Sequence, residues 1–132
     1  MTVQVDGMQQ LLNRLADFAV NNIPNYKFKR EVVEEYIKQH LYYDTLDYVE
    51  DDKGVVYLLR YNINPTGQIA DILDLAIRKD KRNKKIVKFV IARNWARWTS
   101  LRYFRFLREG KYPGRRMRIY SIRKVLSRRN GG

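Results

Sequence analysis

The stretch IADILDLAI RKDKRNKK IVKFVIARNWARW, residues Ile69–Trp98, decides the fold of this chain. Its first part is an apolar run typical of a strand, and its last part carries apolar residues at helical spacing. A strand that leads through a turn into a helix aims the first N–H groups of that helix at an anion. We therefore expect an anion pocket here, with phosphate as its ligand. The turn supplies the cations Arg78, Lys79, Lys81, Arg82, Lys84 and Lys85.

Further elements extend this unit on both sides. Apolar residues recur at helical spacing from Met8 to Ala19 and again from Arg30 to His40, which predicts two amino-terminal helices. From Tyr42 onward the apolar spacing changes to two, which is typical of strands. The expected strands are Tyr42–Val49, Val55–Ile63, Ile69–Ile77, Leu101–Arg108 and Met117–Leu126, and the expected crossover helix is 82–99, with Trp95 and Trp98 on its inner face.

This order of elements predicts an α+β fold of the layered α/β kind. The strand–helix–strand unit at 69–108 should be a right-handed crossover with two parallel strands, whereas the hairpins at 42–63 and 101–126 should be antiparallel. The sheet is then mixed and mainly antiparallel, with two amino-terminal helices and one central crossover helix. We expect a single domain over 1–126 and a disordered tail over 127–132.

Charge is distributed very unevenly along the chain. Residues 1–77 carry 7 Lys/Arg against 12 Asp/Glu, whereas residues 78–132 carry 20 against 2, within a formal net charge of +13. A field of this sign attracts polyanions. Composition alone leaves three partners open, namely nucleic acid, an acidic protein surface and a phosphorylated cofactor.

Composition also excludes several classes of site. The chain has no cysteine and one histidine, His40, so disulfides, thiolate nucleophiles and Cys/His zinc sites are excluded and no metal is expected. No apolar run approaches the ~20 residues that span a bilayer, and the amino terminus lacks a signal-peptide pattern. We expect a cytoplasmic protein without a membrane partner.

The order of elements, together with the basic turn in LDLAIRKDKRNKKIVKFVIARNW, resembles the GNAT superfamily of acyl-CoA-dependent N-acetyltransferases. In that superfamily the strand backbone holds the pantetheine arm of acetyl-CoA, and the turn pattern [QR]-x-x-G-x-[GA] binds its pyrophosphate through backbone amides. The matching stretch here is Arg82–Val87, in which Arg82 fits while Lys85 and Val87 replace the small residues. The resemblance implies acetyl-CoA binding by Leu75, Ile77, Arg82, Asn83, Lys84, Lys85, Ile86 and Val87.

The resemblance also implies transfer of an acetyl group to an amine of a small molecule or a protein. Amine acylation needs a base for the ammonium nucleophile and an acid for the departing thiolate. Asp71 and Asp74 lie three apart in the third strand and so face opposite sides. Asp71 has apolar neighbours that would raise its pKa, which makes it the first choice as base and Asp74 the second. The alternative for Asp71 is an ion pair with Arg60 or Arg105.

The candidate acids are Tyr112 and Tyr120, near the last two strands. Both belong to a set of ten tyrosines, most of which we expect to fill a thin core.

A non-catalytic, polyanion-binding protein is the alternative function. The segment FRFLREGKYPGRRMRIYSIRKVLSRR interleaves aromatic and basic residues, a pattern that neutralises phosphates and stacks bases. The partner would be nucleic acid or an acidic protein. Small size, high charge and the missing motif glycines also suit a phage-encoded derivative of the GNAT fold. The nucleic-acid candidates are Arg102, Arg105, Arg108, Arg115, Arg116, Arg118 and Lys124.

Overall fold

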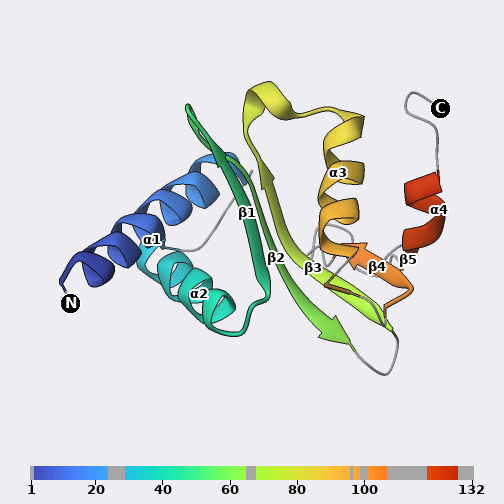
Figure 1. Ribbon diagram of the computed structural model, residues 1–132, viewed down its shortest axis with the longest axis horizontal. Coiled ribbons are helices and arrows are strands. Elements are labelled where there is room, and N and C mark those ends of the chain that lie inside the picture. Colours follow the sequence, from blue (N-terminus) through green and yellow to red (C-terminus); the bar gives the residue numbers. More distant parts are fainter. Residues whose placement is uncertain are drawn as a thin grey trace. The chain divides into compact units, whose positions relative to one another are not determined.

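The structure, a computed structural model, describes residues 2–23, 29–64, 68–95, 97–98, 101–106 and 119–127, and of these it leaves out the side chains of 2–6 and 84. The elements follow the predicted order, with one further helix at the carboxyl end (Figure 1). They are α1 Thr2–Asn22, α2 Arg30–Tyr42, β1 Leu46–Asp51, β2 Gly54–Asn64, β3 Ile69–Ile77, η1 Lys79–Lys81, α3 Lys84–Trp95, β4 Tyr103–Phe106, β5 Ile119–Ser121 and α4 Ile122–Ser127.

The five strands form one sheet in the order β1-β2-β3-β4-β5. The hairpins β1–β2 and β4–β5 are antiparallel. The strands β3 and β4, which the crossover helix α3 connects in sequence, pair in parallel. The described ladder between β3 and β4 joins Ile69–Ile72 to Tyr103–Phe106, and β3 continues beyond it to Ile77. These pairings confirm the predicted α+β class with a mixed sheet.

The first strand, predicted over Tyr42–Val49, lies over Leu46–Asp51 in the structure. Its first residues, Tyr42 and Tyr43, are exposed, and α2 continues as far as Tyr42. Asp44 then adopts a left-handed backbone conformation (φ 55°), which ends the helix and turns the chain into β1. The helical and strand patterns overlap here, so β1 begins only at Leu46.

The predicted fifth strand, Met117–Leu126, is wrong in its second half. β5 ends at Ser121, and Ile122–Ser127 form α4. The Ser121 hydroxyl oxygen accepts a hydrogen bond from the Lys124 N–H (3.3 Å), as a helix-capping residue does. α4 ends at Ser127, the first residue of the expected tail; residues 128–132 lie outside the described residues, and the disordered tail stays a prediction.

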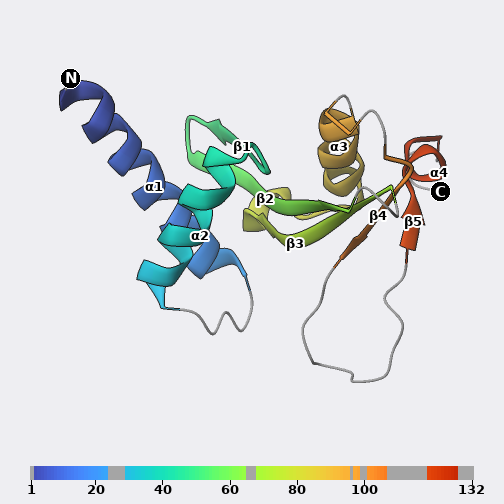
Figure 2. The same ribbon diagram turned by 90° about the horizontal axis from the view of Figure 1, so that it is seen from below.

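Residue contacts divide the chain into two compact units, 1–60 with 75–80 and 61–74 with 81–132. The single domain expected over 1–126 stays a prediction. In the first unit α1 and α2 lie side by side (Figure 2) and bury an apolar core with β1 and β2. The core includes Leu12, Leu15, Ala16, Val33, Ile37, Leu46, Val55, Leu58 and Ala76.

No described helix is both long enough and apolar enough to cross a membrane.

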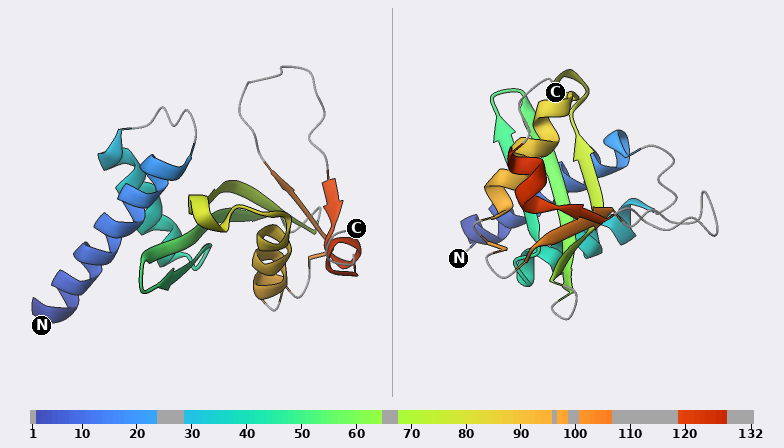
Figure 3. Two further views of the ribbon diagram at one scale, coloured as in Figure 1. Left: turned by 90° about the horizontal axis from the view of Figure 1, so that it is seen from above. Right: turned by 90° about the vertical axis from the view of Figure 1, so that its right-hand side faces the viewer.

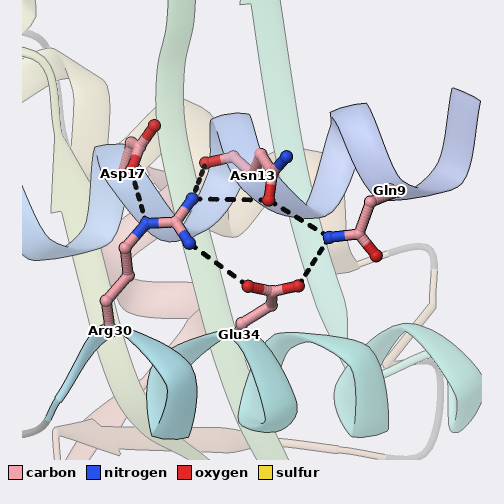
Figure 4. Close-up of polar contacts among 5 residues, drawn as sticks. All are labelled: Gln9, Asn13, Asp17, Arg30 and Glu34. Carbon is pink, nitrogen blue, oxygen red and sulfur yellow. Dashed lines mark hydrogen bonds and ion pairs between the residues drawn. The ribbon is translucent and has the colours of Figure 1, made fainter. Parts of the chain in front are cut away.

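A polar network joins the two helices of the first unit (Figure 4). The Arg30 guanidinium on α2 donates to the Asp17 carboxylate on α1 (2.7 Å) and to the Glu34 carboxylate one turn along its own helix (3.3 Å). Gln9 on α1 donates to both Asn13 and Glu34. The hydrogen bond to Asp17 raises the pKa of the Arg30 guanidinium.

The core of the second unit is aromatic. Trp98 is 1% exposed and meets the Tyr61 ring edge-on, with ring centroids 5.1 Å apart. Tyr120 on β5 stacks on Phe104 of β4 at a centroid distance of 5.2 Å. The helices α3 and α4 lie next to each other in this unit (Figure 3).

Candidate functional site

The first turn of α3 is the predicted anion site, and its amide groups already have an acceptor. The Asn83 side-chain oxygen accepts hydrogen bonds from the N–H groups of Lys85 (2.9 Å) and Ile86 (3.1 Å). This is an N-cap, which forms because asparagine accepts bonds from the unsatisfied amides at a helix start. The donors that the motif would offer to a pyrophosphate are therefore engaged by Asn83.

The side chains around this turn suit an anion. Lys81, Arg82, Asn83 and Lys85 are exposed, and the side chain of Lys84 lies outside the described residues. An exposed cluster of cations attracts phosphates. Lys85 and the half-buried Val87 stand at the two motif positions for small residues, so the backbone is less accessible than in the motif. The residues thus fit a pyrophosphate by charge, and the amides fit it once Asn83 rotates away.

The other predicted cofactor contacts lie on both sides of this turn. Ile86 is half-buried in the first turn of α3. Leu75 and Ile77 are half-buried at the end of β3 and belong to the first unit.

The first cation of the basic segment, Arg78, has a structural role. Its guanidinium donates to Asp51 (2.7 Å) on the β1–β2 hairpin and to Asp80 (2.6 Å). Its main-chain N–H donates to the Val56 carbonyl (2.8 Å). The hydrogen bond to Asp51, and to a smaller extent the one to Asp80, raises the pKa of the Arg78 guanidinium. We therefore leave Arg78 out of the anion site.

Asp71, the first choice as catalytic base, lies in an ion pair. The Arg105 Nε donates to the Asp71 Oδ1 (2.5 Å), and Arg105 Nη2 lies 3.4 Å from Oδ2. The two residues are register partners on β3 and β4, and Asp71 is 9% exposed. The alternative of an ion pair with Arg105 is confirmed. Arg105 thus contacts both oxygens of the carboxylate that was the first choice as base, and the second choice, Asp74, stays a prediction.

The register of the strands shows on which face of the sheet the candidate catalytic residues Asp71, Asp74 and Tyr120 lie. Tyr120 pairs with Phe104, whereas Arg105 pairs with Asp71. Because neighbouring residues of a strand face opposite sides, Tyr120 and Asp71 lie on opposite faces of the sheet. Asp74 lies three residues after Asp71 and so on the face of Tyr120. Asp74 and Tyr120 thus share a face, and Tyr120 is level with Ala70, four residues before Asp74.

Three of the polyanion candidates, Arg102, Arg105 and Lys124, lie in the described part of the chain. Lys124 is exposed on α4, because the second half of the predicted strand is helical. Arg102 is exposed just before β4, while Arg105 is held by Asp71. Outside the described residues lie Tyr112, Arg108, Arg115, Arg116 and Arg118.

Sequence reasoning missed two features. The Asn83 cap was recognisable from an asparagine directly before a helix, but the sequence was matched to a motif in which that position is unspecified. Trp95, predicted to point inward, is the last residue of α3 and is 49% exposed, so that prediction is wrong. Within the described ranges no three His, Asp or Glu side chains gather as a metal site.

Solved structures with a similar arrangement of helices and strands are known, although sequence comparisons find no relative. No protein-family model and no curated protein matches the sequence. A chimera of spermidine N-acetyltransferase SpeG from Vibrio cholerae and hSSAT has a TM-score of 0.55 at 14% identity, over 89% of this chain and 93% of that chain. A probable acetyltransferase has a TM-score of 0.55 at 14% identity, over 88% and 80%.

A third similar structure is the GphF GNAT-like decarboxylase in complex with isobutyryl-CoA, with a TM-score of 0.54 at 15% identity over 77% of this chain. The chain spans 64% of that decarboxylase and 63% of a SpeG mutant from Vibrio cholerae, less than two thirds of each. At these identities the likeness concerns the fold. The strand–helix–strand unit and the surrounding elements thus give this chain a GNAT-like fold.

Proposed function

We propose that this protein is an acyl-CoA-dependent N-acetyltransferase that acts in the cytoplasm on the amine of a small molecule or a protein. The observation that carries the proposal is the placement of Asp74 and Tyr120 on one face of the sheet, beside the parallel pair β3–β4. A carboxylate and a phenol on one face supply the base and the acid that amine acylation needs. The GNAT-like fold supports the same assignment.

Acetyl-CoA would supply the activated acyl group. Arg82 and Lys85 would bind its pyrophosphate through charge, because both are exposed at the start of α3. The N–H groups of Lys85 and Ile86 would add two donors after Asn83 rotates away.

In this mechanism Asp74 would accept a proton from the substrate ammonium, which would free the nitrogen lone pair to attack the thioester carbon that acetyl-CoA supplies. As the C–N bond forms and the C–S bond breaks, the nitrogen would lose its second proton to water, and Tyr120 would donate its hydroxyl proton to the departing sulfur. Proton exchange with water then restores both residues. The stack on Phe104 holds the Tyr120 ring in a fixed plane.

A titration with acetyl-CoA, followed by an assay on amines, tests the proposal. Ligand at about 100 times its dissociation constant adds about 2.7 kcal/mol to the free energy of unfolding, which raises the melting temperature. Inorganic pyrophosphate is the control for a site that takes any polyphosphate. If neither a shift nor acetylation appears at millimolar acetyl-CoA, with spermidine and a lysine peptide among the amines, the proposal is wrong.

Substitutions then test the roles of the two residues. We expect Asp74→Asn and Tyr120→Phe each to lower kcat by about 100-fold or more, because general acid and base catalysis contributes that much. Acetyl-CoA affinity should change little in both variants. Tyr43→Phe is the matched control, since Tyr43 is exposed in the turn after α2. Equal kcat in Tyr120→Phe and Tyr43→Phe would remove Tyr120 from the mechanism.

A further inference from the structure

A pocket of about 450 Å³ opens in the second unit at the carboxyl end of α3. It lies far from the Asn83 cap, because the eleven residue steps from Lys84 to Trp95 span about 16 Å of helix. It therefore cannot be part of the pyrophosphate turn. Its lining residues are Trp95, Leu101, Arg102, Tyr103, Ser121, Ile122 and Arg123.

Two aromatic rings at this pocket are open to solvent. Trp95 is 49% exposed and Tyr103 is 39% exposed. The other tryptophan, Trp98, is 1% exposed, so Trp95 is the tryptophan whose ring a ligand can reach. Large exposed rings beside a pocket offer a stacking surface for a planar ligand.

Two arginines bring positive charge to the same pocket. Arg102 and Arg123 are exposed, and neither forms an ion pair with a carboxylate in the part of the chain that the structure describes. Arg105 on β4, by contrast, does have such a partner, Asp71. The uncompensated guanidiniums therefore favour an anionic ligand.

The main chain holds these groups in place. The Arg102 N–H donates to the Gln68 carbonyl (3.0 Å), and the Arg102 carbonyl accepts from the Ile122 N–H (3.0 Å). Tyr103 and Ser121 are register partners, so their side chains lie on the same face of the β4–β5 pair. The Ser121 oxygen accepts from the Lys124 N–H, which leaves the hydroxyl hydrogen to donate to a ligand.

From this combination we infer that the pocket binds a nucleoside 5′-monophosphate unit, either as a free nucleotide or within a single-stranded nucleic acid. The base stacks on Trp95 and Tyr103. The phosphate accepts hydrogen bonds from Arg102, Arg123 and Ser121. This site is independent of the proposed acetyl transfer, since it involves neither the turn before α3 nor Asp74 and Tyr120.

Tryptophan fluorescence of the full chain measures this binding directly. A base stacked on Trp95 quenches its emission, and the buried Trp98 contributes a constant background. We expect 5′-AMP to quench, and adenosine and inorganic phosphate to bind at least tenfold more weakly, because each supplies only half of the contacts. No quenching by millimolar 5′-AMP, or equal binding of phosphate alone, would overturn the inference.

A ten-nucleotide oligo(dA) distinguishes the two sources of the nucleotide. A single strand reaches further cations, so it should bind more tightly than 5′-AMP and lose affinity steeply with salt. That result assigns the pocket to nucleic acid. Affinity for the oligonucleotide equal to that for 5′-AMP assigns it to free nucleotide.

Variants locate the binding, with affinities measured by calorimetry. We expect Trp95→Ala and Arg102→Gln each to weaken 5′-AMP binding by about tenfold, and Trp95→Phe to retain most of it. Arg97→Gln is the control of equal charge change, since Arg97 is exposed nearby but does not line the pocket. Unchanged melting temperatures confirm that each variant folds. If Arg82→Gln weakens binding and Arg102→Gln does not, the nucleotide binds at the turn and the inference is wrong.

Discussion

Arg105 on β4 and Asp71 on β3 are direct register partners in the parallel pair, and the Arg105 Nε donates to the Asp71 Oδ1 at 2.5 Å. The hydrogen bond to Asp71 raises the pKa of the Arg105 guanidinium above its ordinary value. The Arg105 guanidinium therefore stays charged at neutral pH. It joins the two strands that border the crossover helix, and it occupies the carboxylate that sequence reasoning ranked first as a base.

Removal of one partner of this pair should destabilise the protein. We expect Asp71→Asn to lower the free energy of unfolding by about 2 kcal/mol, because the half-buried Arg105 guanidinium loses its counter-charge. The double variant Asp71→Leu with Arg105→Leu should recover most of that loss, since no buried charge then remains. Urea unfolding measures both. A single variant as stable as the wild type would mean that solvent already screens the pair.

Asn83→Gly should strengthen acetyl-CoA binding by severalfold. The substitution releases the N–H groups of Lys85 and Ile86 from the side-chain oxygen, while glycine at an N-cap costs only a few tenths of a kcal/mol. Calorimetry with acetyl-CoA measures the affinity.

Asn83→Asp serves as the opposite control. An aspartate keeps the cap and adds a negative charge at the helix start, so it should weaken acetyl-CoA binding and leave the melting temperature nearly unchanged. Equal affinities in the glycine and aspartate variants would show that the ligand does not use these amides.

The double variant Arg82→Gln with Lys85→Gln should weaken acetyl-CoA binding, with a change in stability below ~0.5 kcal/mol. Both side chains are exposed, so the lost attraction should shrink as salt rises. Lys38→Gln with Lys53→Gln is the control of equal charge, because both lysines are exposed in the first unit. The anion site lies elsewhere if the two double variants bind acetyl-CoA equally.

Tyr57→Phe should destabilise the first unit by about 2 kcal/mol. The Tyr57 hydroxyl on β2 donates a short hydrogen bond to the Asp47 carboxylate on β1, and both side chains are buried. Hydrogen bonds to buried charged groups contribute about 1.5–3 kcal/mol. Tyr43→Phe, on an exposed tyrosine, should change stability by less than ~0.5 kcal/mol in the same urea titration. A similar effect of both substitutions would contradict a role for the buried bond.

The fold was most predictable where one apolar run ends in an unambiguous polar turn. β3 has the predicted bounds, Ile69–Ile77, because the basic turn leaves no other element to compete for these residues. The segment Ile122–Ser127 was not predictable in this way, since its short pattern suits a strand or a helix. In the structure the Ser121 hydroxyl oxygen accepts a hydrogen bond from the Lys124 N–H, a capping contact that favours the helix.

The site was predictable as a region but not as a set of roles. The sequence indicates a cationic turn before α3, and the exposed Arg82 and Lys85 agree with that. It does not reveal that Asp71 meets a guanidinium 34 positions away, or that Tyr120 faces away from Asp71. Both depend on strand register, which a single sequence does not specify.

By itself the sequence determined the order of elements and the charge gradient, because hydrophobic periodicity and composition are local properties of the chain. Only the tertiary structure decided which carboxylate shares a face with Tyr120, which arginine is neutralised by Asp71, and that Trp95 remains exposed beside Arg102. The physical reason is that side-chain partners are set by strand pairing and by the point where a helix ends. Those features bring together residues that are far apart in the chain, and they follow from the free energy of the whole fold.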